Sequence, residues 1–457
     1  MIAPIRTDAT YACELDEQDE LAGFRERFVI DEPGLIYLDG NSLGRLPKEC
    51  LSRAQTLVRE QWGGRLVRGW NEQWIDLPQR LGAKLARLVG AAADEVIVAD
   101  STSVNFFKLA LAALQARPGR TKVVTDDLNF PSDLYVLQSA VKLAGWAESA
   151  RPTAEIGAGC GPVGLADSAH TTQRKHAAAG HRLEIVPSRD GITIPIDALA
   201  EAIDADTALV ALSHTAFKSG FVYDTPSVTE LAHSRGALVL WDLCHSVGAM
   251  PLSLADAGAD LAVGCTYKYS NGGPGSPAFL YVRRDLQAML QNPIAGWFGH
   301  RDQFAFALDY EPAGGLRQLL TGTPPIVSLA LIEPGLDLLL EAGLDRVRAK
   351  SVRQTEYLIG LWQALLQPLG FTLNSPRHSS IRGSHVSLGH PEGLRIDRAL
   401  IDRMNVIPDF RYPDNIRLGV CPLYTTYTEI HSAVTAMRYV VAERLYEQYP
   451  AERQGVT

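Results

Sequence analysis

Two ionisable residues follow apolar runs that predict buried strands. Asp242 comes after the run 237–241, and Lys268 follows the run 261–263 by a few residues. The carboxyl ends of strands in an open α/β sheet form the edge where ligands bind. A lysine amine can form a Schiff base with an aldehyde cofactor, and a carboxylate can pair with a protonated pyridine nitrogen. The two residues are therefore typical of an enzyme that uses pyridoxal 5'-phosphate (PLP).

Each of these residues also has a structural interpretation. Lys268 could extend its amine to the surface from a strand end, although Tyr267 before it and the glycine-rich stretch 271–275 after it favour a ligand site. Asp242 could cap a helix. His245, taken alone, fits a structural histidine, but a short turn after Asp242 would point both side chains into one pocket.

Four further features have two interpretations each. Hydroxyls at 101–103, between a predicted strand and helix, could bind a phosphate or merely cap the helix. Phe130 could stack on a flat ring or belong to the core. The aromatic cluster 296–300 could line a pocket for an aromatic ligand or pack internally. Arg417 lies in an apolar, strand-like run, where it could bind a substrate carboxylate or form an internal ion pair.

The composition is that of an ordinary globular protein. The chain has 457 residues, 46% hydrophobic and 21% charged, with a net charge of -9. This acidic balance argues against nucleic acid or an anionic membrane as a partner, and no apolar run is long enough to span a bilayer. The start of the chain lacks the apolar segment of a signal peptide. Six scattered cysteines without a CxxC pair argue against disulfides or zinc. We therefore expect a cytoplasmic protein.

The predicted elements alternate between strand and helix from about residue 96. This pattern predicts an α/β fold with a mostly parallel sheet flanked by helices. We expect an N-terminal segment, 1–50, that joins the small domain, a large domain, 51–343, and a small C-terminal α+β domain, 344–457. Residues 147–181 read as an inserted surface loop. The histidines at 170, 176 and 181 have irregular spacing, which favours a solvated loop over a metal site.

Several motifs together resemble one family, the kynureninases. They are 38–44 (LDGNSLG), 129–133 (NFPSD), 241–246 (WDLCHS), 264–275 (GCTYKYSNGGPG) and 296–300 (GWFGH), and 422–424 (PLY) fits as well. The resemblance covers about 13–445 and keeps its order. It implies PLP fold type I, the aminotransferase class V group and a homodimer with shared active sites. The stretch 147–181 looks longer than the connection usual in the family.

The resemblance also implies roles for individual residues. Lys268 would bind PLP covalently, with Asp242 on the pyridine nitrogen and His245 nearby. Tyr267 would contact the phosphate and transfer a proton, so Lys268 and Tyr267 are the expected catalytic residues. The other expected cofactor contacts are Ser101, Thr102, Phe130, Pro131, Ser132, Asp133 and Ser213, with Trp297 and Thr323 contributed across the dimer. Arg417 would bind the substrate carboxylate, and Ser42 and His300 would also contact the substrate.

The implied reaction is hydrolysis of L-kynurenine, or of its 3-hydroxy form, to the matching anthranilate and L-alanine, a step of tryptophan breakdown and NAD synthesis. The sequence does not decide between the two substrates, which differ by one ring hydroxyl. The alternative is a cysteine desulfurase-like carbon–sulfur lyase of the same fold. That chemistry needs a reactive cysteine on a flexible loop, and Cys244, Cys265 and Cys421 are all predicted in or beside strands.

Overall fold

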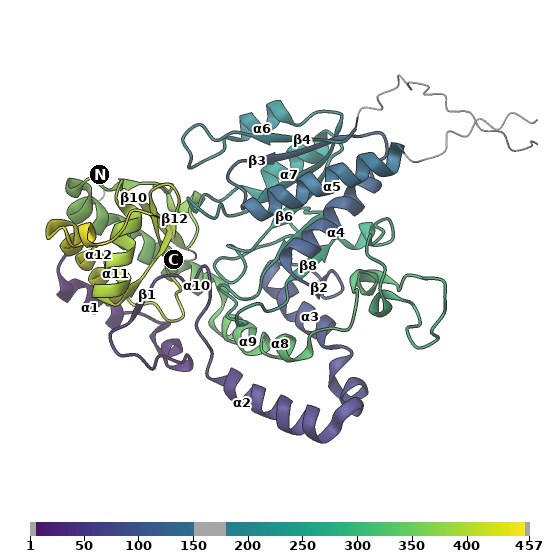
Figure 1. Ribbon diagram of the computed structural model, residues 1–457, viewed down its shortest axis with the longest axis horizontal. Coiled ribbons are helices and arrows are strands. Elements are labelled where there is room, and N and C mark those ends of the chain that lie inside the picture. Colours follow the sequence, from purple (N-terminus) through teal and green to yellow (C-terminus); the bar gives the residue numbers. More distant parts are fainter. Residues whose placement is uncertain (1–5, 150–179, 453–457) are drawn as a thin grey trace, which may run out of the picture.

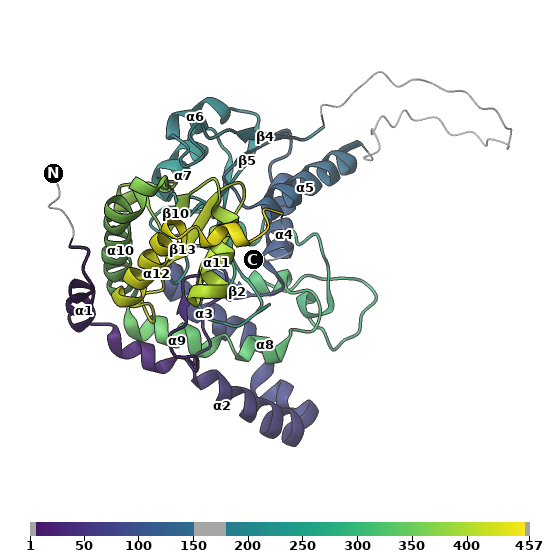
Figure 2. The same cartoon turned by 60° about the vertical axis from the view of Figure 1, so that its left-hand side comes forward.

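A computed structural model describes residues 6–149 and 180–452 of the chain. Most of the predicted insertion 147–181 lies outside these residues, and its first part belongs to helix α5 (Pro131–Ser149). Figures 1 and 2 show a large sheet with its helices beside a smaller lobe built from both ends of the chain. No helix of the described part is long and apolar enough to cross a membrane.

The large sheet has seven strands in the order β2-β8-β7-β6-β5-β3-β4. Their bounds are β2 Val96–Val98, β3 Lys122–Asp126, β4 Arg182–Val186, β5 Thr207–Ser213, β6 Leu238–Asp242, β7 Leu261–Gly264 and β8 Phe279–Val282. The pairs from β7 through β6, β5 and β3 to β4 are parallel, and β8 is antiparallel to both of its neighbours. This confirms the predicted, mostly parallel α/β sheet.

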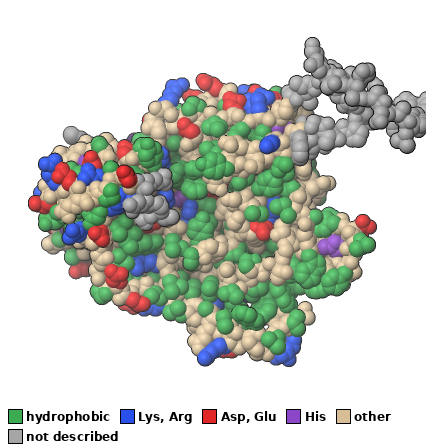
Figure 3. Space-filling view, in the orientation of Figure 1, with side chains coloured by type: hydrophobic (Ala, Val, Ile, Leu, Met, Phe, Trp, Pro, Cys, Tyr) green, Lys and Arg blue, Asp and Glu red, His purple; other side chains and the backbone are tan. Residues whose placement is uncertain are grey.

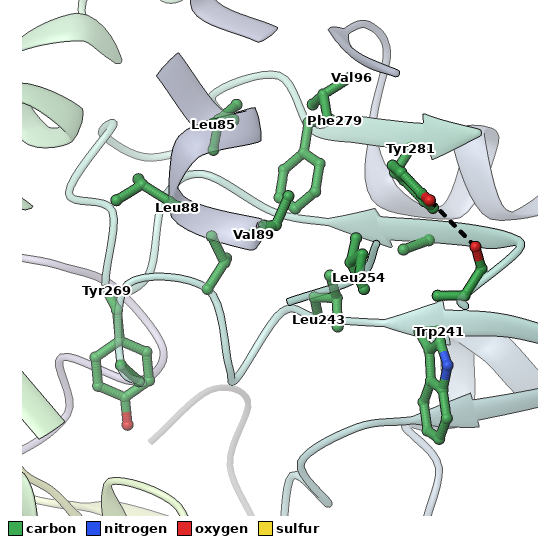
Figure 4. Close-up of a cluster of buried hydrophobic side chains, with 14 of the residues drawn as sticks. Leu85, Leu88, Val89, Val96, Trp241, Leu243, Leu254, Tyr269, Phe279 and Tyr281 are labelled. Carbon is green, nitrogen blue, oxygen red and sulfur yellow. Dashed lines mark hydrogen bonds between the residues drawn. The ribbon is translucent and has the colours of Figure 1, made fainter. Parts of the chain in front are cut away.

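Both faces of this sheet are buried, which explains why its strands read as continuous apolar runs. Along β6, Trp241 belongs to one hydrophobic cluster and Leu240 to another, because neighbouring side chains point to opposite faces. Figure 4 shows part of the first cluster, where α3 packs near Phe279. The helices of this part are α3 Leu77–Val89, α4 Thr102–Gln115, α5, α6 Ile196–Ala202, α7 Thr225–Ser234, α8 Ile326–Ala330 and α9 Glu333–Ala342.

The smaller lobe combines the two ends of the chain. The short strand β1 (Ile36–Tyr37) pairs in parallel with β11 (Val406–Ile407). An antiparallel sheet, in the order β12-β13-β10-β9, lies beside it. Its strands are β9 Thr372–Leu373, β10 His385–Gly389, β12 Asp409–Arg411 and β13 Asn415–Gly419, and the helices are α1 Ala9–Glu17, α10 Leu344–Leu361, α11 Gly393–Met404 and α12 Tyr427–Ala442. Ala12 and Leu38 share one hydrophobic cluster with α10 and α12. The domain boundaries at 50 and 343 stay predictions.

The helical arm formed by residues 49–68 differs from the structure that the sequence predicts. The pattern predicts one helix over 48–62, but the α-helix α2 ends at Thr56 and continues in wider π-type turns over Leu57–Arg65. Gly63 and Gly64 lie in these turns, and glycine weakens the regular helix. The arm projects from the rest of the chain in Figure 1. It exposes large apolar side chains, among them Trp62 and Val67.

Candidate active site

A cavity of ≈ 210 Å³ opens where the carboxyl ends of β5 and β6 meet the smaller lobe. The register brings these ends together, because Ser213 pairs with Asp242 and Asp242 pairs with Val263. The cavity is lined by Ser42, Thr102, Ser103, Phe130, Ser132, Asp133, Ser213, Phe217, Asp242, Cys244, His245, Tyr267, Lys268, Arg411 and Arg417. Eleven of the fifteen were expected from the sequence.

The amine of Lys268 contacts a histidine. Its Nζ lies 2.9 Å from Nε2 of His245. Burial lowers the pKa of His245 well below its ordinary value, and the positive charge of Lys268 lowers it further. His245 is therefore a neutral imidazole that accepts a hydrogen bond from the amine. Its other ring nitrogen has no hydrogen-bond partner among the described residues.

Two carboxylates lie close together on another wall of the cavity. Asp133 is buried at the start of α5, and Asp242 ends β6 and accepts a hydrogen bond from the Cys244 N–H at 2.7 Å. Burial raises the pKa of Asp133 well above its ordinary value, and the adjacent charge of Asp242 raises it further. Oδ2 of Asp133 has no hydrogen-bond partner within the described chain. The pair therefore needs a proton or a cation from a ligand.

Hydroxyl groups gather at the start of α4. The Oγ of Ser103 lies 2.7 Å from the Oγ of Ser132, and Thr102 also lines the cavity. Ser101 caps the helix, since its Oγ accepts a hydrogen bond from the Val104 N–H at 3.4 Å, and it is not among the lining residues. The capping interpretation holds for Ser101. Thr102 and Ser103 offer hydroxyls beside a helix N-terminus, which suits a phosphate.

An aromatic side chain and a phenol complete this part of the cavity. Phe130 packs edge-on against Phe217, with ring centroids 5.2 Å apart. Tyr267 lines the cavity next to Lys268, and the nearby Cys265 together with burial raises the pKa of its phenol above its ordinary value. Tyr267 therefore keeps its proton and can act as a hydrogen-bond donor. Pro131 begins α5 but is not a lining residue.

Arg417 lines the cavity and also forms the internal ion pair that was its alternative interpretation. It is 1% exposed and contacts the Asp409 carboxylate. It donates hydrogen bonds to the Ser42 hydroxyl at 2.7 Å and to the Phe217 carbonyl at 2.6 Å. Arg411, about one third exposed, lies beside it and contacts Oδ2 of Asp409 at 3.0 Å. The cavity thus presents two arginines that share one buried carboxylate.

Three expected site residues lie elsewhere in the chain. Trp297 and His300 line a second cavity formed by 295–310, and Thr323 lines a third, next to β2. The first of these regions exposes apolar side chains, which gather on the lobe at the right of Figure 3. One chain therefore does not bring these three residues to Lys268. The expected contact of His300 with the substrate therefore stays a prediction, as do the cofactor contacts of Trp297 and Thr323.

Sequence reasoning missed Phe217, Cys244 and Arg411 as lining residues, and it named Ser103 only as one of the hydroxyls at 101–103 that could bind a phosphate. Arg411 lies six residues before Arg417, and antiparallel pairing of β12 and β13 turns both side chains toward Asp409. The sequence signal for this arrangement was the pair of strands 409–411 and 415–419, which a short turn joins. Phe217 lies in a loop after β5 that carries no recognisable pattern.

Neither a metal nor a reactive loop cysteine stands out in the described residues. No group of three or more His, Cys, Asp or Glu side chains there could hold a metal ion, and the histidines at 170 and 176 lie outside these residues. Cys244, Cys265 and Cys421 are buried, and Cys13 is exposed in α1. Burial raises the pKa of Cys244 well above its ordinary value, which opposes a nucleophilic thiolate.

The donor set fits PLP. The carboxylate pair, in which Oδ2 of Asp133 has no partner among the described residues, suits a protonated pyridine nitrogen. The hydroxyls at the start of α4 suit a phosphate, and the Lys268 amine suits an aldehyde. The fold agrees with this fit. A cysteine desulfurase from Thermococcus onnurineus NA1 superposes with a TM-score of 0.71 at 18% identity, over 90% of this chain and 95% of that one. A C-DES variant with glycine covalently linked to its PLP cofactor superposes with a TM-score of 0.69 at 17% identity, over 89% and 97%. Fold and site define a PLP-dependent enzyme of fold type I.

The sequence comparisons identify the family within this class. Residues 347–437 match the family model of the kynureninase C-terminal domain. A kynureninase from Pseudomonas fluorescens is 43% identical over 439 residues, which cover 95% of each chain. The chain belongs to the kynureninase family.

Proposed function

We propose that this enzyme hydrolyses L-kynurenine, its 3-hydroxy form, or both, to the matching anthranilate and L-alanine. The observation that carries the proposal is a single cavity that holds an amine, a carboxylate pair, a phenol and two arginines. The arginines suit the substrate carboxylate, and the amine with the carboxylate pair suits the cofactor that processes an amino group.

The cofactor is assigned to residues that the cavity holds together. Lys268 would hold the aldehyde group, Asp133 and Asp242 would pair with the pyridine nitrogen, and Thr102, Ser103 and Ser132 would bind the phosphate. Phe130, Ser213 and His245, which line the same cavity, would contact the rest of the cofactor. Trp297 and Thr323 of the partner subunit would complete the site in a homodimer. His300 of the partner subunit would contact the substrate.

Once bound, PLP draws electrons from the bond to be broken, so that a proton at the substrate α-carbon becomes acidic. Lys268 takes up that proton, and the neutral His245 accepts a hydrogen bond from the lysine and orients its amine. Tyr267, which keeps its phenolic proton, donates a hydrogen bond to the oxygen on which negative charge develops when water adds to the substrate ketone. Arg417 and Ser42 hold the substrate carboxylate.

The dimer is supported by exposed apolar surface rather than by the cavity itself. The loop 295–310 exposes Phe304, Phe306 and Leu308, and the arm after α2 exposes Trp62 and Val67. Burial of such side chains against a second copy would be favourable. We further propose that the enzyme works in the cytoplasm.

The first experiment mixes the purified holoenzyme with L-kynurenine and, separately, with 3-hydroxy-L-kynurenine. Release of the aromatic acid and alanine in equal amounts supports the proposal, and the ratio of kcat/KM values gives the preferred substrate. Sulfide or persulfide release from cysteine, without anthranilate release from either substrate, would instead support the carbon–sulfur lyase alternative.

A further inference from the structure

Three acidic residues surround the two arginines of the cavity. Asp409 contacts both Arg411 and Arg417, and Asp39 lies 3.7 Å from Nη2 of Arg417. Asp397 lies on α11, which packs against the strand that holds Asp409. We call Asp39, Asp397 and Asp409 the acidic triad.

The acidic triad has more negative charge than its surroundings balance. Asp397 and Asp409 are each 1% exposed, and Asp39 retains 17% of its side-chain exposure. Neither oxygen of Asp397, nor Oδ1 of Asp39, has a hydrogen-bond partner in the described part of the chain. Three ionised carboxylates would face two guanidinium groups. A buried excess charge is costly, so the triad favours holding a proton.

A bound substrate carboxylate would add one more negative charge beside the acidic triad. Ser42 accepts hydrogen bonds from Arg417 at 2.7 Å and from Arg411 at 3.4 Å, and its hydroxyl also contacts Asp39. A carboxylate bound to these arginines would therefore lie within the field of all three acids. It would compete with Asp409 for the guanidinium groups.

The other titratable groups around the triad do not supply the missing charge. Tyr37, Tyr269 and Cys421 face Asp39, Arg398 faces Asp397, and His245 and His385 lie beside Arg411 and Arg417. Burial raises the pKa of the Cys421 thiol, so that group stays neutral. Burial keeps both histidines neutral, because it lowers their pKa well below the ordinary value. Burial also keeps both tyrosines protonated, since it raises their pKa. Arg398, on the helix that carries Asp397, is one further cation, but its guanidinium donates its hydrogen bonds to the Pro450 and Glu452 carbonyls and to none of the three acids.

We propose that the acidic triad takes up a proton when the substrate carboxylate binds to Arg411 and Arg417, so that substrate affinity is coupled to protonation of Asp39 and Asp397. The inference rests on the proposed function, because it assigns the carboxylate to these arginines. Asp39 and Asp397 are positioning residues here. They act through the arginines and do not touch the reacting atoms.

The pKa values of Asp39 and Asp397 are shifted in the direction that the proposed coupling requires. Burial, with the charge of Asp409 next, raises the pKa of Asp39 and of Asp397 from 3.8 to about 7 in each case. A bound anion raises both values further, so protons are taken up near neutral pH. By linkage, affinity falls as pH rises above about 7, and approaches about a tenfold loss per pH unit for one coupled proton.

The test measures protons directly on the holoenzyme. The probe is 4-oxo-4-phenylbutanoate, which has the carboxylate and aryl ketone of kynurenine but no amine to react with the cofactor. Its binding heat is recorded by calorimetry at pH 7.5 in two buffers that differ in ionisation enthalpy. Coupling predicts a heat that depends on the buffer and corresponds to proton uptake. Equal heats in the two buffers would overturn the proposal.

Variants of Asp397 distinguish an effect of its charge from an effect on the structure. Asp397→Asn should reduce the uptake and flatten the rise of the probe Kd with pH, whereas Asp397→Glu should restore both. Asp402→Asn is the matched control, since Asp402 is exposed on the same helix, and it should change neither. An unchanged pH dependence in both Asp397→Asn and Asp39→Asn would also overturn the proposal. If the holoenzyme failed to hydrolyse either kynurenine, the proposed function would fall instead, while proton uptake with the probe could still be measured.

Discussion

The Nζ of Lys268 lies 2.9 Å from Nε2 of His245, and burial keeps that imidazole neutral. The lysine therefore has an acceptor for its hydrogen bond inside the cavity. Such a contact would orient the amine that we propose to bind the cofactor and to move a proton.

The first prediction tests this contact. His245→Gln keeps a polar side chain but changes the acceptor, and we expect kcat to fall by about tenfold to a hundredfold with the cofactor still bound. The pH profile of kcat should shift, because the environment of the Lys268 amine changes. The absorbance of bound cofactor and steady-state kinetics measure the two effects. Normal turnover with an unshifted profile would remove the orienting role.

The second prediction concerns Lys268 itself. Lys268→Ala should abolish turnover and the absorbance of covalently bound cofactor, since no other amine lines the cavity in the described residues. A spectrum of the reconstituted variant and an assay of anthranilate release provide the check. Turnover at the normal rate would contradict the whole site.

The third prediction addresses the carboxylate pair. Asp242→Asn and Asp133→Asn each remove one negative charge beside the expected pyridine nitrogen. PLP affinity should fall in both variants, by at least about tenfold for loss of a buried charge partner. Equilibrium dialysis against PLP measures it. Because Asp242 accepts the Cys244 N–H, thermal unfolding of the apoenzyme should be compared, and an equal PLP affinity at unchanged stability would count against the assignment.

The fourth prediction concerns the phenol. Tyr267→Phe should lower kcat by about a hundredfold, in the range seen for loss of one oxyanion donor, and leave KM nearly unchanged. Steady-state kinetics with the preferred kynurenine would show this split. A rise in KM without a fall in kcat would assign Tyr267 to ground-state binding.

The fifth prediction is a pH dependence of stability. The folded-state pKa of Asp397 is raised from 3.8 to about 7 by burial and the nearby Asp409. Its contribution to the free energy of unfolding is thus fully present below about pH 4 and is lost as pH rises through about 7. Relative to wild type, Asp397→Asn should gain on the order of 1–3 kcal/mol between pH 6 and pH 8.5. Thermal melts at both values test this, and parallel loss of Tm in both proteins would contradict it.

Most of the large sheet was predictable because its inner strands are buried on both faces and read as short apolar runs, such as 238–241 and 261–263. The edge strand β4 is partly exposed and has no such run. The smaller sheet was harder to predict, since β10 contains His385 and Ser387 among its apolar residues. The positions of Lys268, Asp242 and His245 followed from strand ends. An internal ion pair of Arg417 was one of two interpretations of the sequence, but its partner, Asp409, became known only from the register of β12 and β13. The proposed contacts of Trp297, His300 and Thr323 require a second chain, whose docking no local pattern specifies.

The pairing of β1 with β11 has a consequence for how the protein is made. Ser42 follows β1 and contacts Arg417, which lies in β13, after β11. The Gly44 N–H donates a hydrogen bond to the Tyr267 carbonyl at 2.8 Å. A ribosome releases the first of these segments long before the other. The strands of the large sheet lie between Ser42 and Arg417 in the sequence, so this sheet can form during synthesis. The proposed substrate-binding wall would thus be assembled last, and a nascent chain able to bind the cofactor would still be unable to hold its substrate.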